Sequence, residues 1–249
     1  MPARLPRSPQ TIPLIATCCA LLVTGSVFAE PRPFRLSYQL SSEGSEIAEV
    51  EQQLERVAPD RWRFSSRVEP SGILATLVGG TISETTQLEM SGARLRPTSY
   101  RFSRRGLGRE RDVTVRFDWS RGRAENEVNE ERWSMRVPDD ALDKHSLVLA
   151  VSADLRDGRL ASSYPVADGG RLKTYTFERL GDERLVTPLG VHDTIKLRRE
   201  RPGGRPATLF WHAPALDHLP VRIERRDGEG RVLRMSLVRY EPGRDGVPR

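Results

Sequence analysis

The stretch Thr208–Tyr240, TLFWHAPALDHLPVRIERRDGEGRVLRMSLVRY, contains the pattern that decides the fold. Apolar and polar residues alternate through Val221–Glu224 and again through Leu233–Leu237. Asp227-Gly228-Glu229-Gly230 separates the two runs, and Asp and Gly tolerate the left-handed dihedrals of a tight turn. Alternation with a period of two on both sides of a turn indicates a β-hairpin. The stretch therefore predicts a strand that ends at a proline loop, followed by a hairpin.

The same alternation recurs along most of the chain. Phe34–Leu40, Trp62–Val68 and Val113–Trp119 carry apolar side chains at alternating positions. Further strands are expected over residues 47–57, 81–90, 100–102, 123–128, 132–137, 172–180, 183–187 and 194–199, with Gly181-Asp182 as a turn. Many strands at regular spacing predict a large antiparallel sheet. Because strands twist, such a sheet curls and must close or wrap around something to cover its apolar face.

One segment departs from this rhythm. Pro138-Asp139-Asp140 ends the alternation, and Asp157-Gly158 ends the apolar run that follows. We expect a helix over Leu142–Arg156, with Asp139 or Asp140 as its cap. The predicted fold class is therefore mainly all-β: a large curved antiparallel sheet or open β-barrel, with the mid-chain helix packed on it or inside it.

The first 29 residues have the features of a secretory signal peptide. Arg4 and Arg7 form a basic start, Ile12–Phe28 is an apolar run, and Val27-Phe28-Ala29 suits a signal peptidase. We predict cleavage after Ala29 and export to a bacterial periplasm. The remainder is expected to form a single β-rich domain over residues 30–240, followed by a disordered polar tail over 241–249.

Two alternatives to cleavage remain. A retained membrane anchor would need about 20 apolar residues, and the run is shorter and interrupted. Lipid attachment at Cys18 or Cys19 would place Thr17, a poor residue for that position, before the modified cysteine. If cleavage occurs after Ala29, both cysteines leave with the signal peptide, and the mature chain has no disulfide and no thiol.

Charge and motifs argue against several function classes. The chain carries a formal net charge of +6 with only 6% aromatic residues, and charges of both signs interleave, so nucleic-acid binding is not favoured. No GxSxG motif occurs, and His145-Ser146 is expected to be an exposed polar pair. His212, Asp217 and His218 do not make up a convincing metal-ligand set. We expect no metal, no cofactor and no enzymatic activity.

Several short motifs occur in an order that is similar to a family of bacterial exported proteins, domain of unknown function 3108. They are Ser71-Gly72 with its apolar follow-on, Leu95-x-Pro97-x-x-Tyr100, Tyr164-Pro165-Val166, Thr187-Pro188-Leu189-Gly190 and the run Trp211–Ile223. The resemblance implies an address and an architecture, and no activity. By looser analogy, the fold is similar to the open barrels of periplasmic lipoprotein carriers.

The run Trp211–Ile223 is the most specific of these motifs. Its signature residues are Trp211, Pro214, Leu219, Pro220 and Arg222, to which we assign structural roles. Trp211 is large and lies beside a proline loop, so its ring is expected to be mostly buried.

An arginine-rich loop is the first segment that could contact a ligand. Arg104 and Arg105 lie among glycines within Arg101–Arg111. Glycines let backbone amides approach an anion and guanidinium groups fit phosphate, which would suit lipid A or an anionic phospholipid. A solvated hairpin neutralised by Glu110 and Asp112 is the alternative.

An apolar segment bracketed by glycines is the second segment that could contact a ligand. Ile73, Leu74 and Leu77 lie within Ser71–Gly80, which is either a short helix or a loop folded over an opening. The segment either fills the core or covers a cavity, and open barrels often hold ligands in such cavities.

Together these features predict a periplasmic, monomeric, non-enzymatic protein. Its curved sheet would bind a hydrophobic or amphipathic envelope molecule, such as a lipid or a lipoprotein, with peripheral contact to the membrane surface. A scaffold for envelope proteins without a small ligand is the alternative from another class, and a hydrolase or other enzyme comes third. A continuous apolar cavity would favour the first hypothesis, and an exposed patch over a filled core the second.

Overall fold

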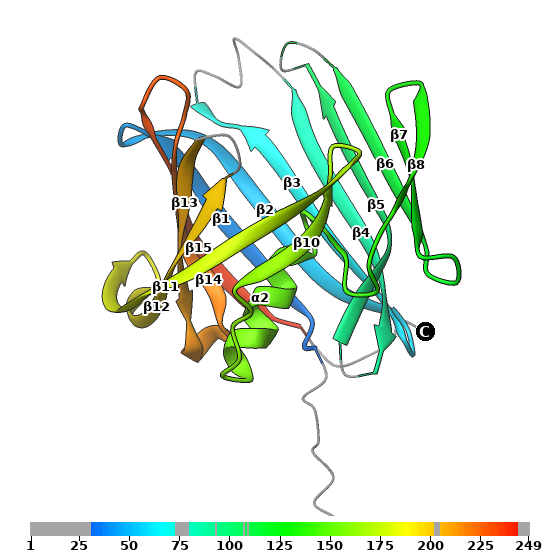
Figure 1. Ribbon diagram of the computed structural model, residues 1–249. Helices are drawn as coiled ribbons and strands as arrows, with labels where there is room; N and C mark the ends of the chain where they lie inside the picture. Colours follow the sequence, from blue (N-terminus) through cyan, green and yellow to red (C-terminus); the bar gives the residue numbers. More distant parts are fainter. Residues whose placement is uncertain are drawn as a thin grey trace, which may run out of the picture.

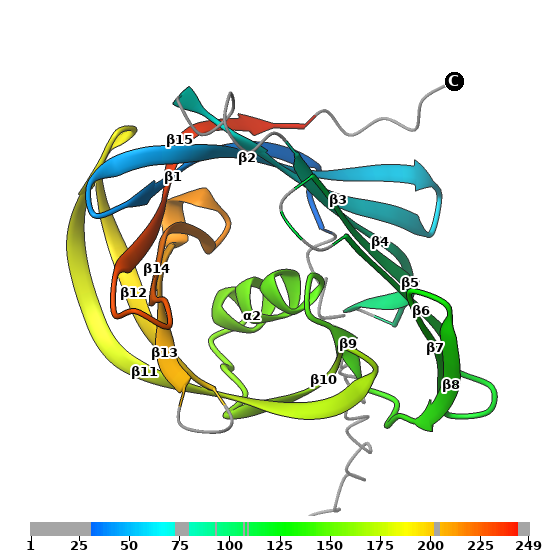
Figure 2. The ribbon, with the colours of Figure 1, turned by 90° about the horizontal axis from the view of Figure 1, so that it is seen from above.

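Alternating apolar residues build one curled sheet in the computed structural model, which describes residues 31–72, 80–92, 94–106, 108, 110–201 and 205–243. These residues form 15 strands in the order β8-β7-β6-β5-β4-β3-β2-β1-β15-β14-β13-β12-β11-β10-β9. The sheet curls around the helix α2 (Leu147–Arg156) and forms an open barrel (Figures 1 and 2). The predicted fold class is confirmed. The strands are β1 (Phe34–Ser42), β2 (Ser45–Ala58), β3 (Arg61–Pro70), β4 (Thr81–Ser91), β5 (Arg94–Arg105), β6 (Arg111–Asp118), β7 (Arg123–Val128), β8 (Glu131–Arg136), β9 (Leu142–Asp143), β10 (Ser163–Asp168), β11 (Arg171–Thr187), β12 (Gly190–Arg201), β13 (Arg205–Ala213), β14 (Leu219–Arg226) and β15 (Val232–Pro242).

The hairpin predicted from the opening stretch is present as β14 and β15. Ile223 is opposite Met235 in an antiparallel pair. The carboxylate of Asp227 accepts hydrogen bonds from the backbone N–H groups of Glu229 and Arg231, at 2.9 and 3.0 Å, and so fixes the turn. Before the hairpin, β13 ends at Ala213 and a single 3₁₀ turn, η1 (Pro214–Leu216), follows, as the proline loop predicted.

The sheet is completed by pairing between its first and last strands. β1 lies between β2 and β15, and Tyr38 is opposite Leu237. The Tyr38 hydroxyl also donates a 2.8 Å hydrogen bond to the backbone carbonyl of Pro220 at the start of β14. Burial of the Tyr38 ring therefore leaves no unpaired polar group at its tip.

The sheet has a seam between β8 and β9, which are consecutive in the chain and lie at opposite ends of the strand order. Trp133 of β8 spans this seam. Its indole N–H donates a 2.9 Å hydrogen bond to the carbonyl of Gly170, in the turn between β10 and β11. A Cβ atom at Gly170 would lie only 1.8 Å from the Trp133 ring, so only glycine allows this contact.

The mid-chain helix is shorter than predicted, and the predicted cap is wrong. Leu142 and Asp143 form the short strand β9, parallel to β10, and the helix begins at Leu147 with Ser146 as its N-cap residue. The carboxylate of Asp143 accepts hydrogen bonds from the backbone N–H groups of His145 and Ser146, at 2.8 and 2.9 Å. These bonds turn the chain between β9 and α2, so neither Asp139 nor Asp140 caps the helix.

Two strand predictions also fail at particular residues. Gly181-Asp182 is not a turn: β11 runs without interruption from Arg171 to Thr187, with a register shift against β12 at Arg179/Gly181. A bulge of this kind inserts one extra residue while the ladder continues, so glycine does not end the strand. β10 was not predicted, because Pro165 interrupts its alternation.

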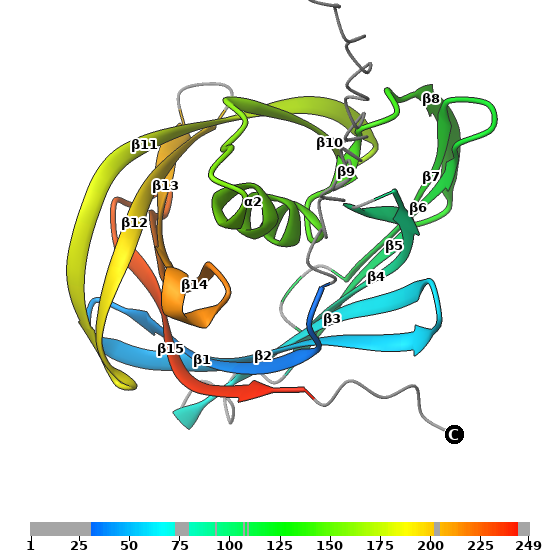
Figure 3. The same ribbon diagram turned by 90° about the horizontal axis from the view of Figure 1, so that it is seen from below.

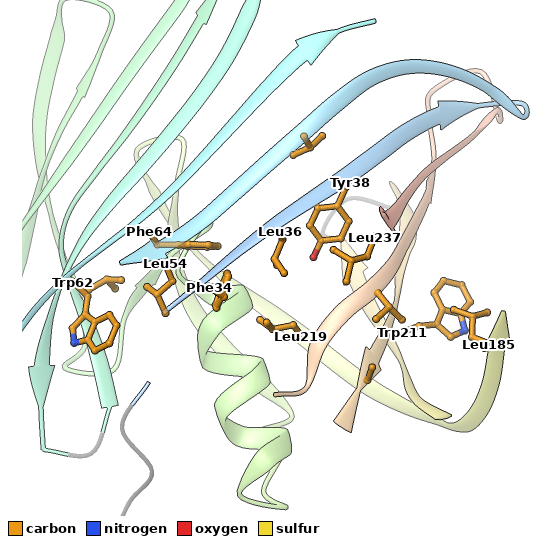
Figure 4. Close-up of a cluster of buried hydrophobic side chains, with 14 residues drawn as sticks. Phe34, Leu36, Tyr38, Leu54, Trp62, Phe64, Leu185, Trp211, Leu219 and Leu237 are labelled. Atoms are coloured by element: carbon orange, nitrogen blue, oxygen red, sulfur yellow. The ribbon is translucent and has the colours of Figure 1, made fainter. Parts of the chain in front are cut away.

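The interior of the curl holds most of the buried side chains. The largest cluster joins both halves of the sheet and includes Phe34, Leu36, Tyr38, Leu54, Trp62, Phe64, Leu185, Trp211, Leu219 and Leu237 (Figure 4). One face of α2, formed by Leu147, Val151 and Leu155, packs on a second cluster with Phe177 and Phe210. The helix is thus inside the sheet, as Figure 3 shows from below.

Several predictions fall on residues that the structure does not describe. These are the signal peptide over residues 1–29, the apolar residues Ile73, Leu74 and Leu77, and the end of the tail over residues 244–249. β15 itself continues through Glu241 and Pro242. Across the described ranges, no helix combines the length and the apolar character needed to cross a membrane.

Candidate functional site

A cavity of about 280 Å³ lies between α2 and one end of the sheet. Its walls come from the β4–β5 turn, the segment that leads into β9, the starts of β1, β10 and β14, and α2 from Leu149 to its C-terminal end at Arg156. This end of the helix and the β4–β5 turn lie at the bottom of Figure 1. The large apolar lining residues are Phe34, Leu54, Leu88, Leu95, Leu142, Leu149 and Leu219. The site therefore joins segments from nearly the whole length of the chain.

The helix creates the cavity through two small residues. Leu149, Ala150, Ala153 and Arg156 line it, at spacings that place them on one face of α2. Ala150 and Ala153 carry only a methyl group, so they leave space where the other face of the helix fills the core with larger side chains. The same helix thus packs on one side and leaves room on the other.

A buried carboxylate lies at the cavity wall. Asp154 is only 2% exposed, and its two oxygens accept hydrogen bonds from Arg94 Nη2 at 2.9 Å and from the Tyr164 hydroxyl at 2.7 Å. Arg94 belongs to β5, Asp154 to α2 and Tyr164 to β10. Burial raises the pKa of the Tyr164 hydroxyl, and the hydrogen bond to Asp154 raises that pKa further. The network holds three walls of the cavity at fixed positions.

Two other arginines of the lining are also paired with carboxylates. Arg96 Nη2 lies 2.6 Å from Glu89 Oε1, and Arg32 lies 3.9 Å from Asp217. Asp139 and Asp140 are exposed at the same end. Charged groups of both signs therefore line the cavity beside its apolar side chains.

A second polar cluster lies deeper, at the junction of β9 and α2. The Thr86 hydroxyl of β4 donates to Asp143 Oδ1 at 3.1 Å and lies 3.3 Å from His145 Nδ1. The His145 ring stacks on Phe64 with 4.0 Å between ring centroids. Burial raises the pKa of the Asp143 carboxyl and lowers the pKa of His145 to about 3. His145 is therefore neutral at physiological pH.

This cluster fixes the start of the helix. His145 and Ser146 are both buried, so the expectation of an exposed pair is wrong. The Ser146 hydroxyl accepts a hydrogen bond from the backbone N–H of Asp143 at 3.2 Å, which closes the local turn. A nucleophilic serine would need its hydroxyl on an imidazole nitrogen. Here the threonine hydroxyl, from a different strand, lies beside the imidazole.

The histidines of the signature loop are placed by backbone contacts. His212 is buried, and its Nδ1 lies 2.7 Å from the backbone carbonyl of His218, to which it donates. Burial lowers the pKa of His212 to about 4. Within the described ranges, no group of three or more His, Cys, Asp or Glu side chains is placed to hold a metal ion.

The remaining signature residues make the following contacts in the structure. Trp211 is 3% exposed, and its indole N–H donates to Glu183 Oε2 at 3.0 Å. Arg222 Nη2 donates to the carbonyl of Val186 at 3.2 Å, and its guanidinium lies 5.8 Å from the Trp211 ring centroid. Pro214 begins η1. Leu219 has a second role that we did not predict, since it also lines the cavity.

The predicted anion loop lies at the other end of the sheet. Arg104 and Arg105 are at the C-terminal end of β5, whereas the cavity is at its N-terminal end. Arg105 Nη2 donates to both carboxylate oxygens of Asp112, at 2.9 and 2.7 Å, which is the neutralised hairpin that we considered as the alternative. Neither arginine lines the cavity.

Sequence reasoning missed the residues that build this site, above all Arg94, Leu149, Asp154 and Arg156. A signal existed for the helix, because small and apolar residues recur at helical spacing over 149–156 beside a separate apolar face. Tyr164 stood in a recognised motif, although its partner in the network could not be named. The pairing of Arg94 with Asp154 has no local signal, since 60 residues separate them.

Solved structures share this fold. A beta-barrel-like protein of domain of unknown function DUF1849 from Brucella abortus is similar at 10% identity with a TM-score of 0.59, covering 86% of this chain and 99% of the other. A candidate lipoprotein from Parabacteroides distasonis has a TM-score of 0.33 at 11% identity, covering 86% of this chain and 97% of the other. At these identities the first likeness shows the fold alone, and the second carries no argument.

Sequence comparison identifies the family and no relative of known function. No curated protein matches the chain. The family described as "protein of unknown function (DUF3108)" matches residues 34–238, which is nearly the whole of the sheet, and the predicted resemblance is therefore confirmed. The chain belongs to the DUF3108 family.

Proposed function

We propose that the protein binds a small amphipathic molecule of the cell envelope in the cavity beside α2, and that it does so in the periplasm without catalysing a reaction. The observation that carries this proposal is the cavity itself. Its lining combines apolar side chains, mainly leucine and phenylalanine, with a few charged groups that include the buried Asp154. Ligand sites in proteins commonly combine an apolar lining with a few fixed polar groups.

The volume limits the size of the ligand. Ligand pockets commonly measure about 300–1,000 Å³, and this cavity of about 280 Å³ lies at the lower end. A single apolar chain with a small polar group would fill it, whereas a lipid with two full chains would extend beyond it. We therefore assign the cavity to a single-chain amphiphile or to one chain of a larger lipid.

A binding role fits the buried polar groups better than a catalytic one. Asp143 Oδ1 accepts hydrogen bonds from the Thr86 hydroxyl and from the backbone N–H of His145, and His145 Nδ1 lies beside the same hydroxyl. Asp154 is engaged by Arg94 and Tyr164. Groups held in this way stabilise the walls of a cavity. The periplasmic address is supported by the signal-peptide features of the first 29 residues.

Native mass spectrometry of protein isolated from its own periplasm tests the proposal. We expect a bound small molecule in the parent protein and its loss in Ala153→Phe, because the aromatic ring would occupy the cavity. Val191→Phe is the control, because it adds the same side chain at an exposed position of β12. A parent protein that carries no bound molecule and binds no added single-chain amphiphile would contradict the proposal.

A second candidate function, docking on another envelope protein, is favoured by the β11–β12 hairpin. Its turn contains the family motif Thr187-Pro188-Leu189-Gly190, and Val186, Leu189 and Val191 are 72%, 38% and 54% exposed. The Thr187 hydroxyl donates to the carbonyl of Gly190 at 3.0 Å, so the turn is ordered while its apolar side chains face solvent. Loss of a copurifying protein in Val186→Ser, with an unchanged small ligand, would support this function.

A further inference from the structure

Arg156 differs from the other arginines that line the cavity. Arg32, Arg94 and Arg96 each form an ion pair with a carboxylate. Arg156, in the last turn of α2, has no ion-pair partner within the part of the chain that the structure describes, and its Nε atom is buried without a hydrogen-bond acceptor there. A buried guanidinium N–H that is left unpaired costs free energy. Arg156 also lines the cavity, so an anionic group that enters there would compensate the charge of its guanidinium.

The helix end does not use this side chain. A cation near a helix C-terminus interacts favourably with the helix dipole, and unbonded carbonyl groups there can accept from an arginine. Here the carbonyl groups of Ala153, Asp154 and Leu155 already accept from backbone N–H groups further along the chain, at 2.8–3.1 Å. The dipole can favour the charge of Arg156, but it does not supply the missing acceptor.

The charges near Arg156 do not supply it either. Asp139 and Asp140 line the same cavity but are exposed, and water solvates them. His218 lies close enough for the charge of Arg156 to lower its pKa, after the larger effect of burial. A neighbouring imidazole held neutral in this way cannot neutralise the guanidinium.

We propose that the ligand of this cavity carries an anionic carboxylate or phosphate group, which Arg156 binds while the apolar chain lies against Leu149 and Leu219. The proposal rests on the ligand-binding function above and adds the chemical class of the ligand. Guanidinium N–H groups match the oxygens of a carboxylate or phosphate in geometry and charge. An uncharged head group could accept a hydrogen bond but would leave the charge of Arg156 uncompensated.

Calorimetric titration with three amphiphiles of equal chain length tests this assignment. Decanoate and decyl phosphate carry an anion, and decan-1-ol carries only a hydroxyl. The full mature protein, washed free of copurified ligand, should bind both anions at least about tenfold more tightly than the alcohol. In Arg156→Gln this preference should be lost, while the affinity for decan-1-ol stays within about twofold.

Arg159→Gln is the matched control. Arg159 lies just beyond the same helix end, is exposed, and pairs with Asp157 at 3.0 Å outside the cavity. Its replacement should leave the preference intact. If Arg156→Gln does not fold, Arg156→Lys can replace it, because lysine keeps the positive charge but lacks the planar guanidinium group. The Arg156→Lys protein should prefer the anions over decan-1-ol, but by less than the parent protein does.

The outcomes separate the two proposals. Affinity of the parent protein for decan-1-ol that equals its affinity for both decanoate and decyl phosphate would overturn the role of Arg156 and leave the binding function standing. An unchanged anion preference in Arg156→Gln would do the same. Binding of none of the three amphiphiles would overturn the binding function, and the inference with it. The comparison of decanoate with decyl phosphate distinguishes a carboxylate ligand from a phosphate-bearing lipid.

Discussion

The indole nitrogen of Trp133 and the carbonyl oxygen of Gly170 are joined by a 2.9 Å hydrogen bond across the seam of the sheet. This bond links β8, one end of the strand order, to the β10–β11 turn near the other end. The ring lies so close to Gly170 that a methyl group there would overlap it. Contact across the seam of the sheet therefore depends on a glycine at position 170.

Gly170→Ala should open this contact and destabilise the fold. Gly158 provides the control, since it has a similar positive φ, 68° against 76°, and no atom lies within 4 Å of the position that its Cβ would take. Left-handed strain alone should cost about 1–2 kcal/mol in both variants. The overlap with Trp133 should add about 1–3 kcal/mol to Gly170→Ala only. Chemical denaturation of both variants measures the difference, which should vanish in a Trp133→Ala background.

Trp211→Ala should be severely destabilising, whereas Asp227→Ala should not. Loss of a buried aromatic side chain costs about 3–5 kcal/mol, which lowers the Tm of a domain of this size by roughly 6–20 °C. Asp227 fixes an exposed turn through solvent-screened hydrogen bonds, and the glycines beside it still permit the bend, so its loss should cost far less. Differential scanning calorimetry measures both. A Trp211→Ala protein that melts like the parent yet loses its ligand would show that the residue acts in binding.

The buried histidines predict a loss of stability in mild acid. Burial lowers the pKa of His212 to about 4, while an unfolded histidine titrates near 6.5, so the unfolded state takes up protons first as the pH falls. Stability is thus full above pH 6.5 and declines between pH 6.5 and 4, by about 2 kcal/mol at pH 5 for this residue. His145, whose pKa is lowered to about 3, should contribute similarly, while Asp143, whose pKa is raised, acts in the opposite direction.

Denaturation curves at pH 7 and pH 5 check this dependence. His212→Asn is the informative variant, because the asparagine amide can still donate to the carbonyl of His218 but does not titrate. The difference in unfolding free energy between the two pH values should shrink by about 2 kcal/mol in that variant. A difference that stays as large as in the parent would show that His212 is not the group that titrates.

A further prediction concerns processing of the N-terminus. Arg4, Arg7 and the apolar run before Ala29 should direct export and cleavage. Edman sequencing of the periplasmic protein should read Glu30-Pro31-Arg32. A protein that begins at Met1, or one with a lipid on Cys18, would show instead that the segment is retained as an anchor or processed differently.

The strands were predictable where the sheet has one apolar face. The alternating apolar residues of Phe34–Leu40 and Val113–Trp119 indicate that face directly. The Asp-Gly sequence at Asp227 indicates where the chain reverses direction between β14 and β15. The start of the helix was not predictable, because Asp143 turns the chain through hydrogen bonds from the backbone N–H groups of His145 and Ser146, and Asp139 and Asp140 offered equally plausible caps. Gly181 was misread because a glycine bulge and a glycine turn have the same local sequence.

The cavity was less accessible to sequence reasoning than the fold. The apolar and arginine-rich segments that drew attention, Ser71–Gly80 and Arg101–Arg111, are notable for composition alone. The residues that line the cavity are ordinary in composition and are brought together only by the curl of the sheet. Ala153 cannot be identified as a cavity residue from the sequence, because the strands that face it across the cavity are not known at that point.

The adjacency of β1 and β15 has a consequence for how the chain folds. Every other neighbouring pair in the described sheet joins consecutive strands, so most of the ladder can form from local contacts. The pairing of Phe34 with Pro242 must instead bring together residues more than 200 positions apart, at the entropic cost of a very long loop. Until the C-terminal strand has been synthesised, β1 and β14 both present unpaired edges that can join other chains. Premature truncation before Val232 should therefore produce aggregation rather than a smaller folded domain.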